Sequence, residues 1–376
     1  MNEKNSDIKR KFSRALETQK NGFIKFLDRT VRKIIVLNEE NVKDMPKGGI
    51  IVCCTHRSHL DYVILGLKIP EFGADQIRFA AGDNLTRIPI LGKIFRSVGA
   101  FSLYRGKSSQ RSYITRLADQ VKLMVAGGDS VIVFPEGGRS YSGRMLDIKS
   151  VVLAAGVLAQ KDNVNKPVYY LPAAINYTKI PDLQAFDLLL KGKTLRDGNK
   201  NIFLKFFGGF LYYFADIRAF LISYIFNIRT DVILNVGKPT PLSEITDVEK
   251  KFRAEAKLPI VANRDSIHEC SRWVSERLSK LFPILPMNAA AYLLYNFGTK
   301  GCNEENFEKT LKKLKNLGFY VELLETAPTK NIIKDGIKAL KENGAVNGYF
   351  RSDIKRKKRL KYFADFINSY LNEEGK

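Results

Sequence analysis

Hydrophobic residues in the middle of the chain form short runs that alternate with longer amphipathic stretches. Runs typical of buried strands lie at 50–54, 77–81, 100–105, 130–134, 167–177 and 231–237. Stretches with helical spacing lie between them at 61–67, 87–98, 111–128 and 151–160. Short buried strands that alternate with helices are typical of an α/β domain. We therefore predict a mixed, largely parallel sheet flanked by helices.

The pattern changes on both sides of this core. Residues 8–37 place apolar residues on one helical face and basic residues on the other, which predicts an N-terminal amphipathic helix. Beyond residue 245 helical spacing dominates, with Asn303 as an N-cap and Gly318 as a stop of one helix. The sequence thus predicts three regions: an N-terminal helical region (1–45), a central α/β domain (46–245) and a C-terminal helical region (246–376).

The charge balance of the chain is strongly basic. It has 62 Lys and Arg against 39 Asp and Glu, a formal net charge of +23. Such a field attracts polyanions, which include nucleic acid, an anionic membrane surface and phosphorylated substrates. Charge alone does not choose among them, but no DNA- or RNA-binding motif is found, so we expect no nucleic-acid partner.

Membrane contact is expected at the surface of a bilayer rather than across it. No stretch reaches the ~18 uninterrupted apolar residues of a spanning helix. The nearest is the aromatic segment 202–228, which Lys205, Asp216 and Arg218 interrupt. It suits the membrane interface, and a hairpin buried in the protein core remains an equal alternative. The N-terminus has no secretory signal, and the four cysteines have no disulfide spacing, which favours the cytoplasmic face.

Two of the three histidines lie in one polar turn, at the point where a predicted strand gives way to a helix. His56 and Asp61 are five residues apart, so the turn can bring imidazole and carboxylate within hydrogen-bonding distance. The carboxylate would fix the tautomer and raise the basicity of the other ring nitrogen. This is the base half of a Ser-His-Asp triad without the serine, which requires a hydroxyl supplied by the substrate. A purely structural polar turn is the alternative.

A second polar turn, "FPEGGRSYSGRMLDIK" at 134–149, follows another predicted strand. Its glycines leave backbone amides accessible, and four cations lie near strand ends: Arg105, Arg139, Arg144 and Lys149. Cations and glycines of this kind predict a phosphate pocket. The chain has no Walker A motif and no G-x-G-x-x-G, and three histidines with scattered cysteines do not predict a metal site. We therefore expect neither a metal nor a cofactor.

Four blocks in this order resemble the glycerolipid acyltransferase family. They are "HRSHLD", "GAFSLYR", "FPEGGRS" and "YLPAAINY", which together cover residues 56–177. Glu-Gly-Gly-Arg-Ser with a following Gly-Arg is closest to the glycerol-3-phosphate and dihydroxyacetone-phosphate acyltransferases. Tyr104 and Tyr141 stand where arginines are common, which lowers the positive charge around the acceptor phosphate.

The resemblance implies an O-acyltransferase whose catalytic domain is the region 46–245. It would transfer a fatty acyl group from acyl-CoA or acyl carrier protein to the sn-1 hydroxyl of glycerol 3-phosphate, making lysophosphatidate. Dihydroxyacetone phosphate and a lysophospholipid are alternative acceptors. A basic membrane- or nucleic-acid-binding protein, or a scaffold that has lost activity, are the alternatives outside enzymes.

The resemblance also implies roles for single residues. His56 would be the general base and Asp61 its orienting partner. Glu136 and Gly137 would shape the acceptor site, with backbone amides there helping to stabilise the oxyanion. The acceptor phosphate would be held by Arg105, Arg139, Arg144 and Lys149. The product belongs in an anionic bilayer, so we expect contact with that membrane through the N-terminal helix and 202–228.

Overall fold

A computed structural model describes most of the predicted α/β core and the C-terminal region. The described residues are 28–74, 76–82, 100–103, 111–162, 165–180, 183, 186, 203–204, 207–208, 211, 229–256, 258–346 and 354–372. The helix predicted at 87–98, the N-terminal residues 1–27, Arg105 and most of 202–228 lie outside them.

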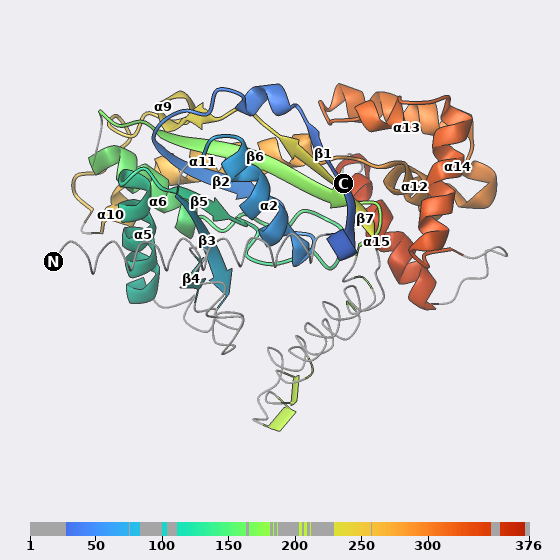
Figure 1. The fold of residues 1–376 in the computed structure, drawn as a ribbon, viewed down its shortest axis with the longest axis horizontal. Coiled ribbons are helices and arrows are strands. Elements are labelled where there is room, and N and C mark those ends of the chain that lie inside the picture. The colour runs from blue at the N-terminus through green and yellow to red at the C-terminus, as the bar shows by residue number, and fades with distance from the viewer. Residues whose placement is uncertain are drawn as a thin grey trace.

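The described part of the chain forms one mixed sheet in the order β1-β7-β6-β2-β5-β3-β4, with β8 beside β6 (Figure 1). The strands are β1 (Val31–Leu37), β2 (Gly49–Cys54), β3 (Ile77–Gly82), β4 (Ala100–Leu103), β5 (Ser130–Val133), β6 (Val168–Tyr177), β7 (Thr230–Val236) and β8 (Thr240–Pro241). Five neighbouring pairs are parallel, and β6 pairs antiparallel with β7 and with β8. The predicted mixed, largely parallel sheet is confirmed.

Helices cover the faces of the sheet, and the C-terminal helices lie beyond one end of it (Figure 1). Those between the strands are α2 (Leu60–Glu71), α5 (Arg111–Ala126) and α6 (Val151–Asp162), with the 3-10 helix η1 (Glu39–Val42) after β1. Those that follow the sheet are α9 (Leu242–Ile245), α10 (Pro259–Ala262), α11 (Arg264–Leu281), α12 (Pro286–Gly301), α13 (Glu304–Asn316), the 3-10 helix η4 (Glu322–Leu324), α14 (Thr329–Glu342) and α15 (Ile354–Leu371). Asn303 caps α13 by accepting the Asn306 N–H, as its sequence position predicts.

The prediction of helix through residue 37 is wrong for its last seven residues. Residues 31–37 are strand β1, which pairs parallel with β7, for example Ile35 beside Ile233. Four of the seven are Val or Ile, whose branched side chains suit a sheet. The Arg32 guanidinium also donates to the Asp231 carboxylate on β7, with Nε 2.7 Å from Oδ1. The sheet therefore starts before residue 46, inside the region expected to be N-terminal helix.

The core lies on both faces of the sheet, and β2 contributes to each in turn. Ile50, Val52 and Cys54 face the cluster that includes α2, whereas Ile51 and Cys53 face the cluster under α5, α6 and α11. This alternation is the two-residue period of a strand. Because both faces are covered, the strand is apolar throughout.

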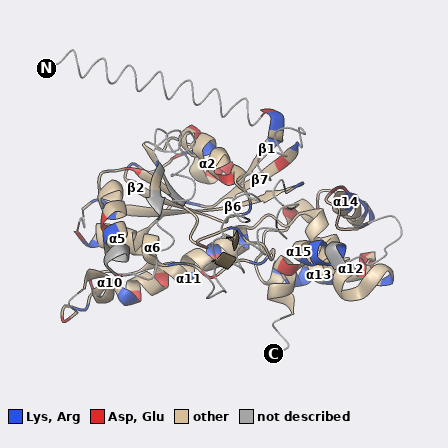
Figure 2. Cartoon of the chain, turned by 90° about the horizontal axis from the view of Figure 1, so that it is seen from below, with Lys and Arg blue, Asp and Glu red and all other residues tan. Residues whose placement is uncertain are grey.

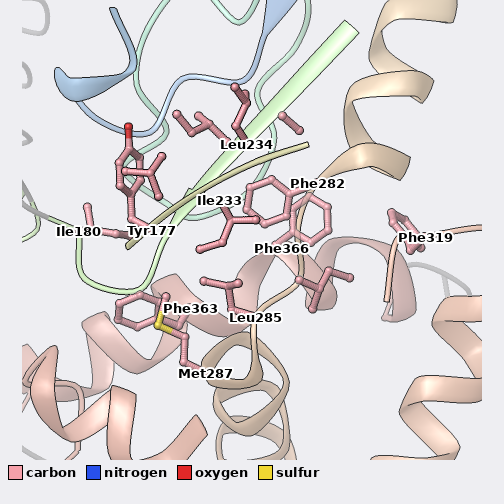
Figure 3. Close-up of a cluster of buried hydrophobic side chains, with 14 of the residues drawn as sticks. Tyr177, Ile180, Ile233, Leu234, Phe282, Leu285, Met287, Phe319, Phe363 and Phe366 are labelled. Atoms are coloured by element: carbon pink, nitrogen blue, oxygen red, sulfur yellow. The ribbon is translucent and has the colours of Figure 1, made fainter. Parts of the chain in front are cut away.

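The C-terminal helices complete this core instead of forming a separate appendage. Phe282, after α11, stacks on Phe366 of α15 with ring centroids 4.1 Å apart. Both belong to the same buried cluster as Tyr177 and Ile233 of the sheet (Figure 3). Lys and Arg residues are frequent along α13 and α15 (Figure 2). Within the described ranges, no helix combines the length and apolar character needed to cross a bilayer.

Candidate active site

Three strand ends converge on the two polar turns. In the parallel pairs, Cys53 of β2 lies beside Val133 of β5, and Cys54 lies beside Ala173 of β6. The turn with His56 therefore follows β2 at the same edge where the second polar turn follows β5. The end of β6 runs past both strands to Tyr177. Polar side chains far apart in the sequence meet at this carboxyl edge, where ligands of α/β sheets bind.

Asp61 is the centre of the first turn. It lies in the first turn of α2 and is fully buried. Its Oδ2 is 2.7 Å from His56 Nδ1, 2.6 Å from the Arg57 amide nitrogen and 3.0 Å from the Ser58 amide nitrogen. Its Oδ1 accepts a hydrogen bond from the Tyr177 hydroxyl. The carboxylate thus binds the turn, the imidazole and the end of β6 together.

The ring of His56 is contacted by two aromatic rings and by Asp61, which leaves one ring nitrogen available. Its ring stacks on Phe134 with centroids 4.1 Å apart and meets the Tyr62 ring edge-on at 5.3 Å. Because Asp61 occupies Nδ1, Nε2 is the nitrogen left for a substrate, and no described residue is hydrogen-bonded to it. Burial lowers the pKa of His56 below its usual 6.5, and the charge of Arg139 lowers it too, while Asp61 opposes both. The imidazole is therefore neutral and able to accept a proton at pH 7.

This pKa predicts the acid limit of any reaction that uses His56 as a base. A lowered pKa means that the neutral form persists below pH 6.5, so kcat/KM should fall only as the pH drops below that value. The measurement is kcat/KM between pH 4.5 and 8, on the order of ten pH values, with thermal unfolding recorded across the same range. An acid limb centred above pH 6.5, in protein that remains folded, would contradict the prediction.

The second turn is tied to the first through Glu136. Its Oε1 accepts the His56 amide at 3.1 Å, and its Oε2 accepts the Leu146 amide at 2.8 Å. Burial raises the pKa of this carboxyl, and the charge of Arg57 opposes that rise. The structure therefore places Glu136 as a support for the His56 backbone. The Gly137 amide donates to the Phe134 carbonyl at 2.9 Å, so this N–H of the turn is used within the turn.

The predicted cations differ in how they are placed. Arg139 is buried, close enough to His56 to affect its pKa, and its Nη2 is 3.0 Å from the Tyr141 hydroxyl. Arg144 is half exposed, with Nε 3.6 Å from the Asp365 carboxylate of α15. Lys149 is exposed, and its stem lies against Gly137. Of these predicted cations, Arg139 is the one whose charge affects His56, while Arg105 lies outside the described residues.

Arg57 is a site residue that the sequence reasoning left without a role. It is 1% exposed, and its Nη1 donates to the Gly143 carbonyl at 3.0 Å. Its guanidinium carbon lies 4.6 Å from the centre of the Phe282 ring, while Nε and Nη2 have no hydrogen-bond partner among the described residues. Tyr177 and Asp365 were likewise missed, although Tyr177 ends the fourth sequence block. These three residues connect the two turns to β6 and to the C-terminal helices.

Gly143 allows α15 to approach the second turn. Its φ is +85°, and a Cβ there would lie 1.8 Å from the Tyr362 carbonyl oxygen. We expect Gly143→Ala to lower the free energy of unfolding by at least about 1–3 kcal/mol from backbone strain alone, since the clash adds to it. Gly138→Ala is the matched control, because a Cβ at Gly138 meets nothing within 4 Å. Urea unfolding measures both, and equal midpoints would contradict this contact.

The cysteines beside His56 are not suited to act as nucleophiles. Cys53 and Cys54 are free thiols that are fully buried on opposite faces of β2. Burial raises the pKa of both thiols well above the usual range. The thiolate, which is the reactive form, is therefore scarce near neutral pH.

Comparison with known proteins finds several that resemble this chain. Residues 33–176 match the family model described as Acyltransferase. Glycerol-3-phosphate acyltransferase from Alteromonas mediterranea is 34% identical over 193 residues, 48% of this chain and 24% of that protein. The protein of the same name from Pseudoalteromonas atlantica is 28% identical over 341 residues, 86% of this chain and 39% of that protein. The chain thus spans well under half the length of these curated relatives.

A solved structure is also similar. It is the crystal structure of the 1-acyl-sn-glycerophosphate acyltransferase from Thermotoga maritima, 20% identical over 73% of this chain and 83% of that one, with a TM-score of 0.36.

Proposed function

We propose that this chain, whose residues 33–176 match the Acyltransferase family model, transfers a fatty acyl group from an acyl thioester to the sn-1 hydroxyl of glycerol 3-phosphate. The observation that carries the proposal is the buried His56–Asp61 pair, whose Nε2 is left for a substrate at the carboxyl edge of the sheet. Two of the curated relatives act, by their names, on this acceptor.

The reaction needs a base, an acceptor hydroxyl and a thioester. His56 Nε2 takes the proton of the hydroxyl as its oxygen attacks the thioester carbonyl carbon. The C–O bond forms, the carbonyl oxygen carries the negative charge of the tetrahedral intermediate, and the C–S bond then breaks. The imidazolium returns the proton to the leaving thiolate, while Asp61 stabilises the imidazolium in between. The products are lysophosphatidate and a free thiol.

Arg139 is the residue best placed to bind the acceptor phosphate. It is 6% exposed and influences His56, so a phosphate paired with it would lie near the base. Arg144 is a weaker candidate, because Asp365 already lies 3.6 Å from its Nε. Tyr141 accepts from Arg139 in a position where the family often has another arginine. With fewer cations, dihydroxyacetone phosphate and lysophospholipids remain acceptors to be tested.

Thiol release from palmitoyl-CoA tests the proposal. Purified protein in anionic liposomes should release thiol when glycerol 3-phosphate is added, and lysophosphatidate should form in equal amount. Dihydroxyacetone phosphate and a lysophospholipid are run beside it to rank the acceptors. If no acceptor supports release from palmitoyl-CoA or from palmitoyl-acyl carrier protein, the proposed activity is wrong.

We also place the reaction at an anionic membrane surface, on the cytoplasmic face. The net charge of +23 and the Lys and Arg residues along α13 and α15 support this location. In flotation experiments the protein should bind vesicles with about 30% phosphatidylglycerol and lose most of that binding in roughly 0.5 M salt, because salt screens the attraction. Equal binding to purely zwitterionic vesicles would contradict an electrostatic attachment.

A further inference from the structure

A cavity of about 750 Å³ lies beside the second turn, between the loop 144–150, helix α11 and the end of α15. Ser369 and Tyr370 line it on the α15 side. Neither the family model, which ends at residue 176, nor the sequence blocks include α11 or α15. We call this space the α11 cavity. Its volume falls in the range of small-molecule sites, roughly 300–1,000 Å³.

The wall formed by α11 is cationic. Arg264, His268 and Arg272 line the cavity and are spaced four residues apart, so they lie along one face of the helix. All three are exposed, and Arg264 has no carboxylate partner among the described residues. With Arg144 opposite, three guanidinium groups and an imidazole line the space; the Asp147 carboxylate lines it too, and the Asp365 carboxylate lies 3.6 Å from Arg144 Nε. The cavity is therefore suited to a ligand with several negative charges.

Two hydrogen bonds to Glu136 link the loop wall of the α11 cavity to the backbone of His56. Leu146, in its loop wall, donates its amide to Glu136, and the other oxygen of that carboxylate accepts the amide of His56. The loop between Glu136 and the cavity wall thus has one end at each site. A ligand that extends from the cavity along this loop would reach the carboxyl edge of the sheet where His56 lies.

Resting on the proposed function, we propose that the α11 cavity binds the phosphate-bearing nucleotide end of the acyl thioester donor, with CoA as the carrier. Coenzyme A carries a 3′-phosphate and a 5′-diphosphate, separated from its thiol by the pantetheine arm. Arg264 and Arg272 are about 12 Å apart along the helix axis, at about 1.5 Å per residue. The single phosphate of glycerol 3-phosphate cannot span that distance, so the site fits the donor and not the acceptor.

Direct binding of CoA tests this site without relying on catalysis. Isothermal titration calorimetry measures the Kd for CoA in the wild-type protein and in each variant. We expect Arg264→Ala/Arg272→Ala to raise the Kd for CoA about tenfold or more, because two charge-assisted contacts are lost. Lys312→Ala/Lys313→Ala on α13 is the matched control. It removes the same charge from exposed positions outside the cavity.

The possible outcomes distinguish a failure of the proposed CoA site from a failure of the proposed acyl transfer. In the assay of the full chain, the arginine variant should raise the KM for palmitoyl-CoA while the KM for glycerol 3-phosphate stays within about twofold. An unchanged Kd for CoA together with an unchanged donor KM would overturn the α11 site and leave the proposed activity standing. CoA binding that depends on the two arginines, without any acyl transfer, would retain the site and reject the activity. Wild-type protein that binds acyl carrier protein but not CoA would also overturn the nucleotide site.

Discussion

His56→Ala should reduce acyl transfer to glycerol 3-phosphate by about 10²–10⁴-fold, the usual contribution of a general base. The acceptor hydroxyl is a poor nucleophile until its proton is removed, and His56 Nε2 is the described group positioned to remove it. The KM values should change far less than kcat, since the imidazole assists the transition state more than it binds either substrate. The measurement is steady-state thiol release over a range of both substrates.

Two controls make this result specific. His59→Ala removes the other imidazole of the same turn and should keep most of the activity, since Asp61 Oδ2 stays paired with His56 Nδ1. Thermal unfolding of both variants checks that the cost of the cavity in His56→Ala has not unfolded the protein. If folded His56→Ala transferred acyl groups at more than about a tenth of the wild-type rate, the polar turn would have a structural role only.

The local pattern of the sequence was enough to predict most of the sheet. Strands 50–54, 130–134 and 167–177 were predictable because they are buried on both faces and therefore read as continuous apolar runs. Residues 31–37 were assigned to the wrong element because Val31, Ile34 and Ile35 also have helical spacing. Their pairing with β7 is a contact across nearly 200 residues, which no local pattern contains.

In the candidate site, too, some residues could be predicted from the local sequence and others could not. The His56–Asp61 pair was predictable because both residues lie in one short turn, and the structure has them hydrogen-bonded. Arg57 and Asp365 carry no local signal, since their roles come from packing of the C-terminal helices against the second turn. Which N–H groups of the glycine-rich turn are used internally, such as that of Gly137, could not be predicted, because the turn sequence does not reveal its backbone hydrogen bonds. The catalytic and phosphate-binding roles of the predicted residues stay predictions.

Asp61→Asn should lower kcat by about 10²–10⁴-fold while the protein still folds, since loss of the equivalent charge in Ser-His-Asp triads costs about 10⁴-fold. The amide oxygen can still accept the Arg57 and Ser58 N–H groups that Asp61 Oδ2 accepts at 2.6 and 3.0 Å. What disappears is the negative charge that stabilises the imidazolium. Asp61 raises the pKa of His56 against the effect of burial, so that pKa should fall further in the variant.

Tyr177→Phe distinguishes the charge of Asp61 from its positioning. The hydroxyl of Tyr177 donates to Asp61 Oδ1, so its removal leaves the charge in place with one support fewer. A hydrogen bond to a charged group contributes about 1.5–3 kcal/mol to stability, and only the part that differs between ground and transition states changes kcat. We therefore expect roughly a tenfold loss of kcat, which is about 1.4 kcal/mol and less than the loss in Asp61→Asn. NMR titration of the His56 ring nitrogens in both variants tests the cause, because only Asp61→Asn should shift its pKa strongly downward. If Asp61→Asn and Tyr177→Phe lose the same activity and leave the His56 pKa unchanged, Asp61 holds the turn together and does not serve the base.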